Sequence, residues 1–161
     1  MKLLETWVKA PFLRDASLLV VGECVQTVSY DVYRKFEEGR VVLTSCPEAE
    51  NTGSVMGKLA AIIACSNPKE ITVLTMEGSP HCFMLHAALN EAAFVTGSNV
   101  PSKHFVVVDG KATEVSPESV RMGRHLHLVQ KCIENYPKIL EDLGRHSLEQ
   151  RCSMKPNRRR I

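Results

Sequence analysis

Residues 17–24 have the sequence SLLVVGEC, an unbroken apolar run that ends in a glycine, a glutamate and a cysteine. Two later segments have the same design: residues 40–46 have the sequence RVVLTSC, and residues 71–82 have the sequence ITVLTMEGSPHC. Apolar runs of this length are typical of parallel strands that are covered on both faces. Because each run is followed by a stretch of helical character, the chain alternates strand and helix.

Capping and turn signals predict the remaining elements. Asp109-Gly110 favours a hairpin turn, and Pro137 is expected to interrupt or divide the last helix. The expected helices cover residues 29–38, 81–96 and the region from 116 onward, and another is capped by Asn51 or Thr52 and stopped by Asn67-Pro68. The further strands cover residues 105–108 and 112–115. The sequence therefore predicts an α/β protein, a three-layer Rossmann-like or flavodoxin-like sandwich with a mainly parallel sheet of about four strands.

Composition is that of an ordinary globular protein. The chain has 161 residues, of which 44% are hydrophobic and 24% are charged, with a formal net charge of +2. This near-balance predicts neither nucleic-acid binding nor membrane association. With no secretory signal and no apolar stretch long enough to span a bilayer, the expected location is the cytoplasm. We expect a single α/β domain over residues 1–150 and a basic, flexible tail over residues 151–161.

Common nucleotide-binding motifs are not matched. Residues 53–59 resemble a phosphate-binding loop, but the glycines are too close together and Leu59 stands where a hydroxyl should meet magnesium. Residues 22–24 take the place of a glycine-rich loop after the first strand. The sequence therefore carries no nucleotide motif.

Three cysteines follow three of the predicted strands. Cys24, Cys46 and Cys82 each lie just beyond an apolar run. Right-handed crossovers bring the carboxyl ends of parallel strands to one edge of the sheet, where ligands bind. We therefore expect these thiols to converge on a metal, cluster or redox site. The other three cysteines are expected in structural or tail positions: Cys65, Cys132 and Cys152.

A fourth ligand is available beside the third cysteine. His81 adjoins Cys82, and three thiolates with one imidazole suit tetrahedral zinc. The Cys46-Pro47 pair is typical of iron–sulfur cluster loops, which favours a 4Fe-4S cluster. His86, four residues after Cys82, is expected in a supporting or core position. The leading hypothesis is a metal- or iron–sulfur-binding redox domain, with His81 or an exogenous group as the fourth ligand.

Two alternatives use other chemistry. In the first, Cys46 or Cys82 acts without metal as a thiolate nucleophile, while His81 or Glu77 transfers protons. In the second, the chain is a non-catalytic domain that assembles with a redox protein partner through its final helical region. The sequence specifies neither the oligomeric state nor a substrate.

Residues 23–30, 45–48 and 76–82 resemble the motifs of a known domain family. That family is an α/β domain usually found C-terminal to ferredoxin-type 4Fe-4S modules in anaerobic bacteria and archaea. Its pattern is approximately Asp-Cys, Gly-Cys-Pro and Met-Glu-Val-Pro-Cys-Cys, and the similarity covers about residues 18–108. The resemblance implies an iron–sulfur or redox context for this chain.

The chain departs from the family pattern in two ways. It contains no ferredoxin-type cysteine runs, and the Cys-Cys pair of the family is replaced by His81-Cys82 with one extra residue before it. The resemblance therefore supports Cys24, Cys46 and Cys82 as site residues, and it supplies no specific reaction.

Overall fold

The computed structural model describes residues 1–153. The chain divides into two compact units, Met1–Val120 and Arg121–Ile161. This division falls earlier than the boundary expected at residue 150, and the single domain over 1–150 stays a prediction. The N-terminal unit contains the sheet and both hydrophobic cores, so it is the part that positions a site.

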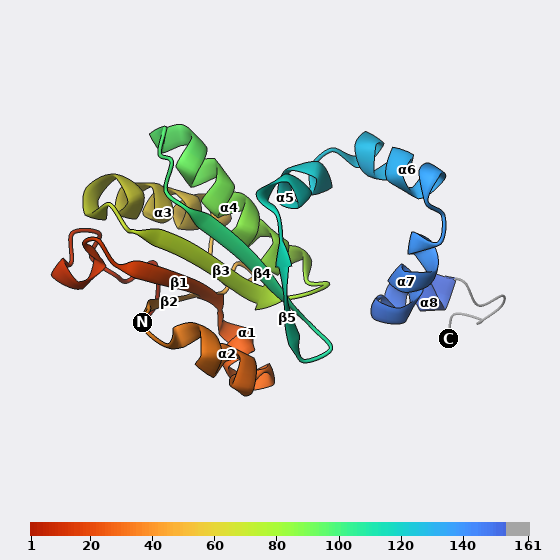
Figure 1. The fold of residues 1–161 in the computed structure, drawn as a ribbon, viewed down its shortest axis with the longest axis horizontal. Coiled ribbons are helices and arrows are strands. Elements are labelled where there is room, and N and C mark those ends of the chain that lie inside the picture. Colours follow the sequence, from red (N-terminus) through yellow and green to blue (C-terminus); the bar gives the residue numbers. More distant parts are fainter. Residues whose placement is uncertain (154–161) are drawn as a thin grey trace. The chain divides into compact units, whose positions relative to one another are not determined.

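One five-stranded sheet forms the centre of the N-terminal unit (Figure 1). The strands are β1 (Ser17–Gly22), β2 (Val41–Ser45), β3 (Glu70–Met76), β4 (Ser102–Val108) and β5 (Lys111–Val115). Their order is β2-β1-β3-β4-β5, with β5 antiparallel and the others parallel. The predicted fold class is confirmed, and the order of the parallel strands is that of flavodoxin-like sheets.

The strand register brings the ends of β1, β2 and β3 to the same level. Gly22 of β1 lies beside Ser45 of β2, and Val21 lies beside Leu74 of β3. The strand order reverses between β1 and β3, which makes this edge the topological switch point where open α/β sheets bind their ligands.

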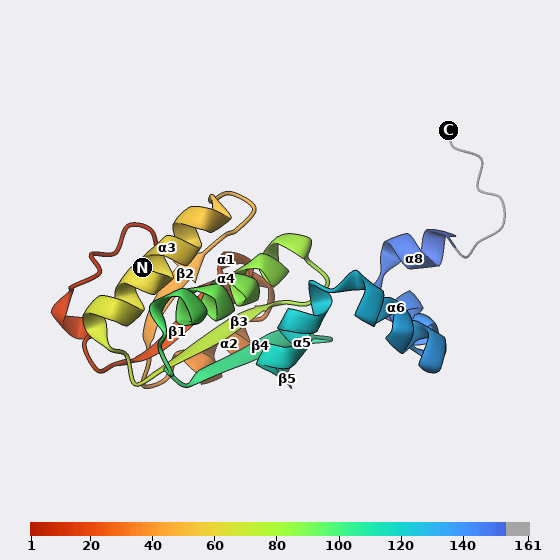
Figure 2. The same cartoon turned by 90° about the horizontal axis from the view of Figure 1, so that it is seen from above.

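Helices cover both faces of the sheet (Figures 1 and 2). Those of the N-terminal unit are α1 (Glu23–Val28), α2 (Tyr30–Glu37), α3 (Thr52–Ser66), α4 (Pro80–Thr96) and the start of α5 (Pro117–Gly123), with a short 3-10 helix at Pro11–Leu13. Helices α3 and α4 pack together on one face, and α1 and α2 lie on the other. The result is the predicted three-layer arrangement.

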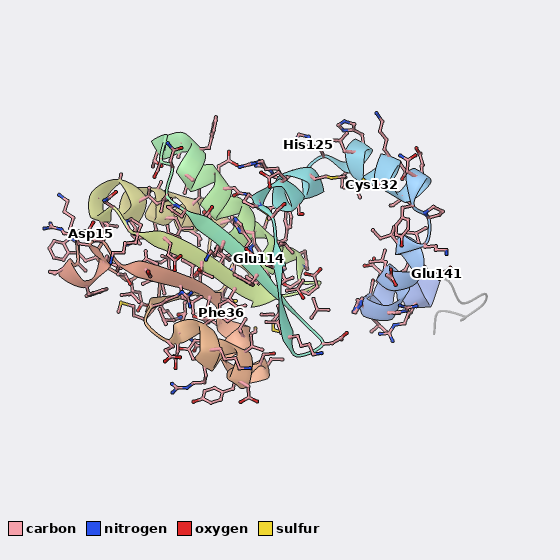
Figure 3. The ribbon with its side chains drawn as sticks, in the orientation of Figure 1. Asp15, Phe36, Glu114, His125, Cys132 and Glu141 are labelled. Atoms are coloured by element: carbon pink, nitrogen blue, oxygen red, sulfur yellow. The ribbon has the colours of Figure 1, made fainter. Side chains whose placement is uncertain are left out.

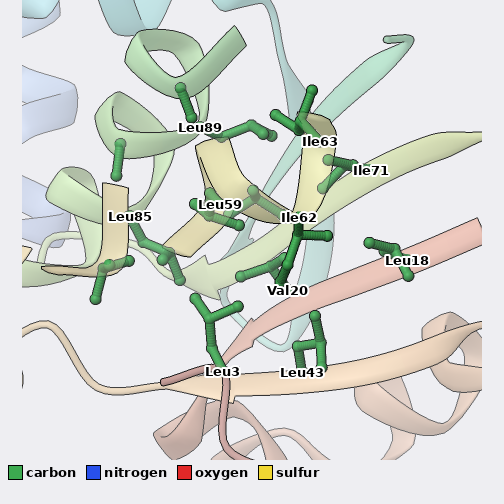
Figure 4. Close-up of a cluster of buried hydrophobic side chains, with 14 of the residues drawn as sticks. Leu3, Leu18, Val20, Leu43, Leu59, Ile62, Ile63, Ile71, Leu85 and Leu89 are labelled. Atoms are coloured by element: carbon green, nitrogen blue, oxygen red, sulfur yellow. The ribbon is translucent and has the colours of Figure 1, made fainter. Parts of the chain in front are cut away.

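Alternate residues of β1 belong to two separate hydrophobic cores. Leu18 and Val20 point to the α3–α4 side, where they join the larger cluster shown in Figure 4. Leu19 and Val21 point to the α1–α2 side and join the smaller cluster. Because both faces are covered, every position of β1 after Ser17 is buried, which explains the unbroken apolar run in the sequence.

The helices on the larger core begin and end at residues that cap helices well. Asn51 caps α3 by accepting a bond from the Ser54 N–H at 3.0 Å, and Asn67 ends that helix in the left-handed conformation. Ser79 caps α4, and Gly97 ends it at φ +62°. The turn at Asp109-Gly110 has positive φ at both residues, as a tight hairpin requires.

The C-terminal unit is helical in the part that the structure describes. Beyond α5 it contains α6 (Leu126–Asn135), α7 (Ile139–His146) and α8 (Leu148–Ser153), none of which has a buried residue. The helix expected from residue 116 is divided near Pro137, as predicted, and also after Gly123, where glycine weakens the helix. Residues 151–153 end α8, and the rest of the expected basic tail lies outside the described residues. Within residues 1–153, no helix is long and apolar enough to cross a membrane.

Candidate functional site: a thiol pocket at the carboxyl ends of the strands

A small pocket opens at the edge where β1, β2 and β3 end. Its lining includes Cys24, Cys46, Cys82 and His81, the four residues that the sequence singled out. We call it the thiol pocket; its full lining is Gly22, Glu23, Cys24, Val25, Ser45, Cys46, Pro47, Glu48, Met76, Ser79, His81 and Cys82. The structure therefore places three thiols, each from the segment that follows a different strand, around one space.

Cys46 has a firmly held backbone. The Glu50 carboxylate accepts a hydrogen bond from the Ser45 hydroxyl at 2.6 Å and another from the Cys46 N–H at 3.2 Å. The Cys46 carbonyl in turn accepts bonds from the N–H groups of Ala49 and Glu50, both at 2.9 Å. These bonds close a tight turn directly after β2. Glu50 was not predicted from the sequence, because its role depends on the turn that it closes.

Cys82 lies in the first turn of α4. Its N–H donates to the Ser79 hydroxyl at 3.3 Å, so the cap of the helix also fixes the backbone of the cysteine. A β-carbon built onto Gly22 would lie 3.8 Å from the Cys82 sulfur. The thiol therefore sits against the carboxyl end of β1, the central strand of the three.

Cys24 enters the pocket from the other side of the sheet edge. It is the second residue of α1, which begins immediately after Gly22, and it is exposed. Neighbouring Glu23 forms a long ion pair with Lys2 at 3.6 Å. Cys24 is therefore the least enclosed of the three thiols, since Cys46 and Cys82 are both half-buried.

His81 and Glu48 lie at the rim. The His81 Nδ1 is 3.8 Å from a Glu48 carboxylate oxygen, and both side chains are at least half exposed. An ion pair of this length in solvent contributes little to stability. The two side chains are therefore free to turn toward a ligand that enters the pocket.

The pocket is small, and its side chains are not gathered around a single point. Its volume is about 40 Å³, which holds on the order of three water-sized groups. Within residues 1–153, no three His, Cys, Asp or Glu side chains stand close enough together to hold a metal ion. A metal would therefore require the thiols to rotate inward on their fixed backbones.

Other features of the sequence lie away from this pocket. Residues 53–59, which resemble a phosphate loop, are helical residues of α3. Cys65 lies on α3 and Cys132 on α6, within helical regions as expected, and both are exposed; Cys132 is labelled on α6 in Figure 3. Cys152 lies in α8 and is also exposed.

A buried polar chain lies beneath the pocket. The Nε2 of His86 on α4 is 2.8 Å from the Thr75 hydroxyl on β3, and its Nδ1 is 3.0 Å from Nδ1 of His104 on β4. We call these three residues the buried histidine chain, because each is at most 3% exposed. Burial, with a further contribution from His104, lowers the pKa of His86 to about 3, so this ring is neutral at pH 7.

Two members of the buried histidine chain, Thr75 and His104, were not predicted from the sequence. It placed His86 in a supporting or core position, and it began the fourth strand at Phe105. The strand begins at Ser102, so His104 alternates with Phe105 and faces the same side as Val106. A strand extended by three residues toward its start would have revealed an inward-facing histidine.

Comparisons with known proteins agree with this architecture. Residues 10–159 match the Rossmann-like domain family, and the chain belongs to that family. An uncharacterised protein of Archaeoglobus fulgidus is 30% identical over 106 residues, which cover 66% of this chain and 74% of the relative. No solved structure matches the chain.

Proposed function

From a Rossmann-like fold with three thiols at its switch point, we propose that this chain binds a soft metal centre in the thiol pocket. Cys24, Cys46 and Cys82 are the proposed ligands, and His81 or an exogenous group is the fourth. The observation that carries the proposal is the convergence of all four residues on one pocket at the strand ends. The resemblance to domains that accompany iron–sulfur modules supports the same interpretation, as does the reducing, cytoplasmic setting expected from the sequence.

The donor set fits a soft ion. Thiolate sulfur and imidazole nitrogen are the ligands that zinc and iron–sulfur iron prefer over oxygen. The backbones of Cys46 and Cys82 are fixed by hydrogen bonds, so metal binding would require their side chains to rotate inward. Three protein ligands would leave one position for His81, a water molecule or a substrate.

The kind of centre decides the chemistry of the pocket. The pocket has an open side at exposed Cys24, so a single ion and a 4Fe-4S cluster are both proposed occupants. A zinc ion held this way would act as a structural centre or a Lewis acid, and a cluster would carry electrons.

The second candidate function is metal-free thiolate chemistry at Cys82. One observation favours it: the thiol lies in the first turn of α4, whose N-terminus supplies partial positive charge that stabilises an anion. His81 is the adjacent residue in the same pocket and is available as a proton carrier.

The test is a metal and acid-labile sulfide assay on the full chain, purified without oxygen. We expect about one centre per chain in the wild type and most of it lost in Cys24→Ala, Cys46→Ala and Cys82→Ala. Cys65→Ala, which removes an exposed thiol outside the pocket, should retain it. Iron with sulfide indicates a cluster, and zinc without sulfide indicates a single ion.

Two results would overturn the metal proposal. One is equal metal content in the pocket variants and in Cys65→Ala. The other is a metal-free wild type in which Cys82 reacts with iodoacetamide much faster than Cys65 at neutral pH, which would support the thiolate alternative.

A further inference from the structure

Helix α4 carries apolar side chains around most of its circumference. Leu85 and Leu89 are fully buried, whereas Phe94 and Val95 on the same helix are exposed. Apolar contacts have no preferred direction, so burial alone weakly specifies which face of such a helix meets the sheet. A directional contact is needed to fix the rotation of α4 about its own axis.

The buried histidine chain provides that contact. His86 bonds Thr75 of β3 through one ring nitrogen and His104 of β4 through the other. The distances of 2.8 and 3.0 Å are those of ordinary hydrogen bonds. Such bonds weaken steeply when the donor and the acceptor are no longer aligned. Strands β3 and β4 are therefore both hydrogen-bonded to α4 through His86.

The neutral His86 ring carries one ring proton, which limits how its two hydrogen bonds can be made. Only one proton fits between the two Nδ1 atoms, so a Thr75 hydroxyl that donates to His86 leaves His86 to donate to His104. His104 also contributes to the lowered pKa of His86, and α3 meets α4 through apolar residues such as Leu59 and Ile62. His86 therefore stays uncharged through the neutral pH range.

Thr75 connects this chain to the thiol pocket. Its methyl carbon Cγ2 and the Cys82 sulfur both lie 3.8 Å from the point that a Gly22 β-carbon would occupy. Cys82 precedes His86 by four residues and so lies on the same face of α4. One side of the Thr75 side chain thus faces the end of β1, where the thiol sits, and its hydroxyl bonds His86.

We propose that Thr75, His86 and His104 are positioning residues for Cys82: they fix the rotation of α4 and so set its sulfur against the end of β1. A rotation of α4 by one residue would turn Cys82 by about 100° and remove it from the pocket. This inference rests on the proposed function only for the role of Cys82 as a metal ligand. The positioning itself is measured without metal.

The experiment compares alkylation of two thiols in one molecule. Metal-free, full-length protein is treated with iodoacetamide, and mass spectrometry of peptides gives the rate at Cys82 relative to Cys46. Thr75→Val keeps the side-chain shape but removes the hydroxyl, and Thr75→Ser keeps the hydroxyl. Ser66→Ala is the matched control, because it removes another buried hydroxyl bond, to the Val8 carbonyl at 2.5 Å, at the far end of α3.

In Thr75→Val, we expect the Cys82-to-Cys46 rate ratio to change about three- to tenfold, the equivalent of one lost buried hydrogen bond. Thr75→Ser should restore the ratio to within about twofold of the wild type, and Ser66→Ala should leave it unchanged even though it lowers stability. If Thr75→Val does not fold, His104→Gln replaces it with the same expectation.

An unchanged ratio in the folded Thr75 or His104 variant overturns the positioning role. An equal change in Ser66→Ala also overturns it, since the effect would then follow general loss of stability. Neither result depends on metal content, so this proposal and the metal proposal can fail separately.

Discussion

The thiol pocket and the buried histidine chain are one helical turn apart on α4, yet their surroundings are opposite. Cys82 faces an open pocket whose other thiols are half-buried or exposed. His86 is 3% exposed and bonded at both ring nitrogens. In the thiol pocket, hydrogen bonds fix the backbones of Cys46 and Cys82, and the side chains can rotate. In the buried histidine chain, hydrogen bonds fix the side chains themselves.

This difference separates two uses of polar residues in one fold. Groups that meet a ligand keep rotational freedom and solvent access, because they must change partners when the ligand arrives. Groups that hold the scaffold are buried and hydrogen-bonded, because a buried polar atom without a partner is costly. Each of the following predictions tests one side of this contrast.

The largest effect on stability is expected from His86→Ala. Removal of the ring leaves a cavity and takes a partner from both Thr75 and His104, so the free energy of unfolding should fall by about 3 kcal/mol. Urea unfolding followed by circular dichroism measures the change. Met84→Ala on the same helix, where the side chain is 39% exposed, should cost less than about 1 kcal/mol. Equal losses in the two variants would contradict the assigned role of His86.

The second expected effect is a pH dependence of the free energy of unfolding, caused by His86. Above pH 6.5 His86 is neutral in both the folded and the unfolded state. Below pH 6.5 the unfolded state binds a proton at His86, whereas the folded state does not bind one until about pH 3. Stability should therefore be complete above pH 6.5 and fall as the pH drops toward 3, by about 2 kcal/mol at pH 5.

The comparison with His86→Gln isolates this contribution. Gln does not titrate, so the stability difference between wild type and variant should shrink by about 2 kcal/mol from pH 7.5 to pH 5. Urea unfolding at both pH values measures it. A difference that stays constant across this range would show that His86 binds its proton equally in both states.

A smaller effect is expected at the turn that holds Cys46. Glu50→Ala removes the acceptor for the Ser45 hydroxyl and the Cys46 N–H, and should cost about 1 to 2 kcal/mol in urea unfolding. Glu50→Gln keeps an acceptor oxygen and should lose less. If both variants unfold like the wild type, the turn is held by its backbone bonds alone.

The smallest effect concerns thiols outside the pocket. Cys65→Ser and Cys132→Ser change exposed side chains, so each should alter the free energy of unfolding by less than about 0.5 kcal/mol. Thermal unfolding of each variant beside the wild type provides the check. A loss above about 1 kcal/mol would indicate that the thiol packs against apolar neighbours.

The sequence predicted the sheet and the thiol pocket because both follow from short-range patterns. The apolar run of residues 17–22 specifies a strand buried on both faces, and parallel topology then gathers the strand ends. Cys24, Cys46 and Cys82 could therefore be placed at one edge without knowledge of the strand order.

The buried histidine chain could not be predicted in the same way. Thr75 and His104 are 29 positions apart by their numbering, and only the pairing of β3 with β4 brings them to the same helix. The sequence also does not determine the rotation of α4, since its apolar residues fit more than one. Long-range pairing and helix rotation are properties of the packed chain.

The most direct test of the central claim is a cobalt titration of reduced, metal-free protein, followed by thiolate-to-cobalt charge-transfer absorption. Three pocket thiols on one ion predict an absorption that falls by about one third in each of Cys24→Ala, Cys46→Ala and Cys82→Ala. The same absorption should be unchanged in Cys65→Ser. An absence of charge-transfer absorption in the wild type, or equal absorption in all four variants, would contradict a shared thiol site.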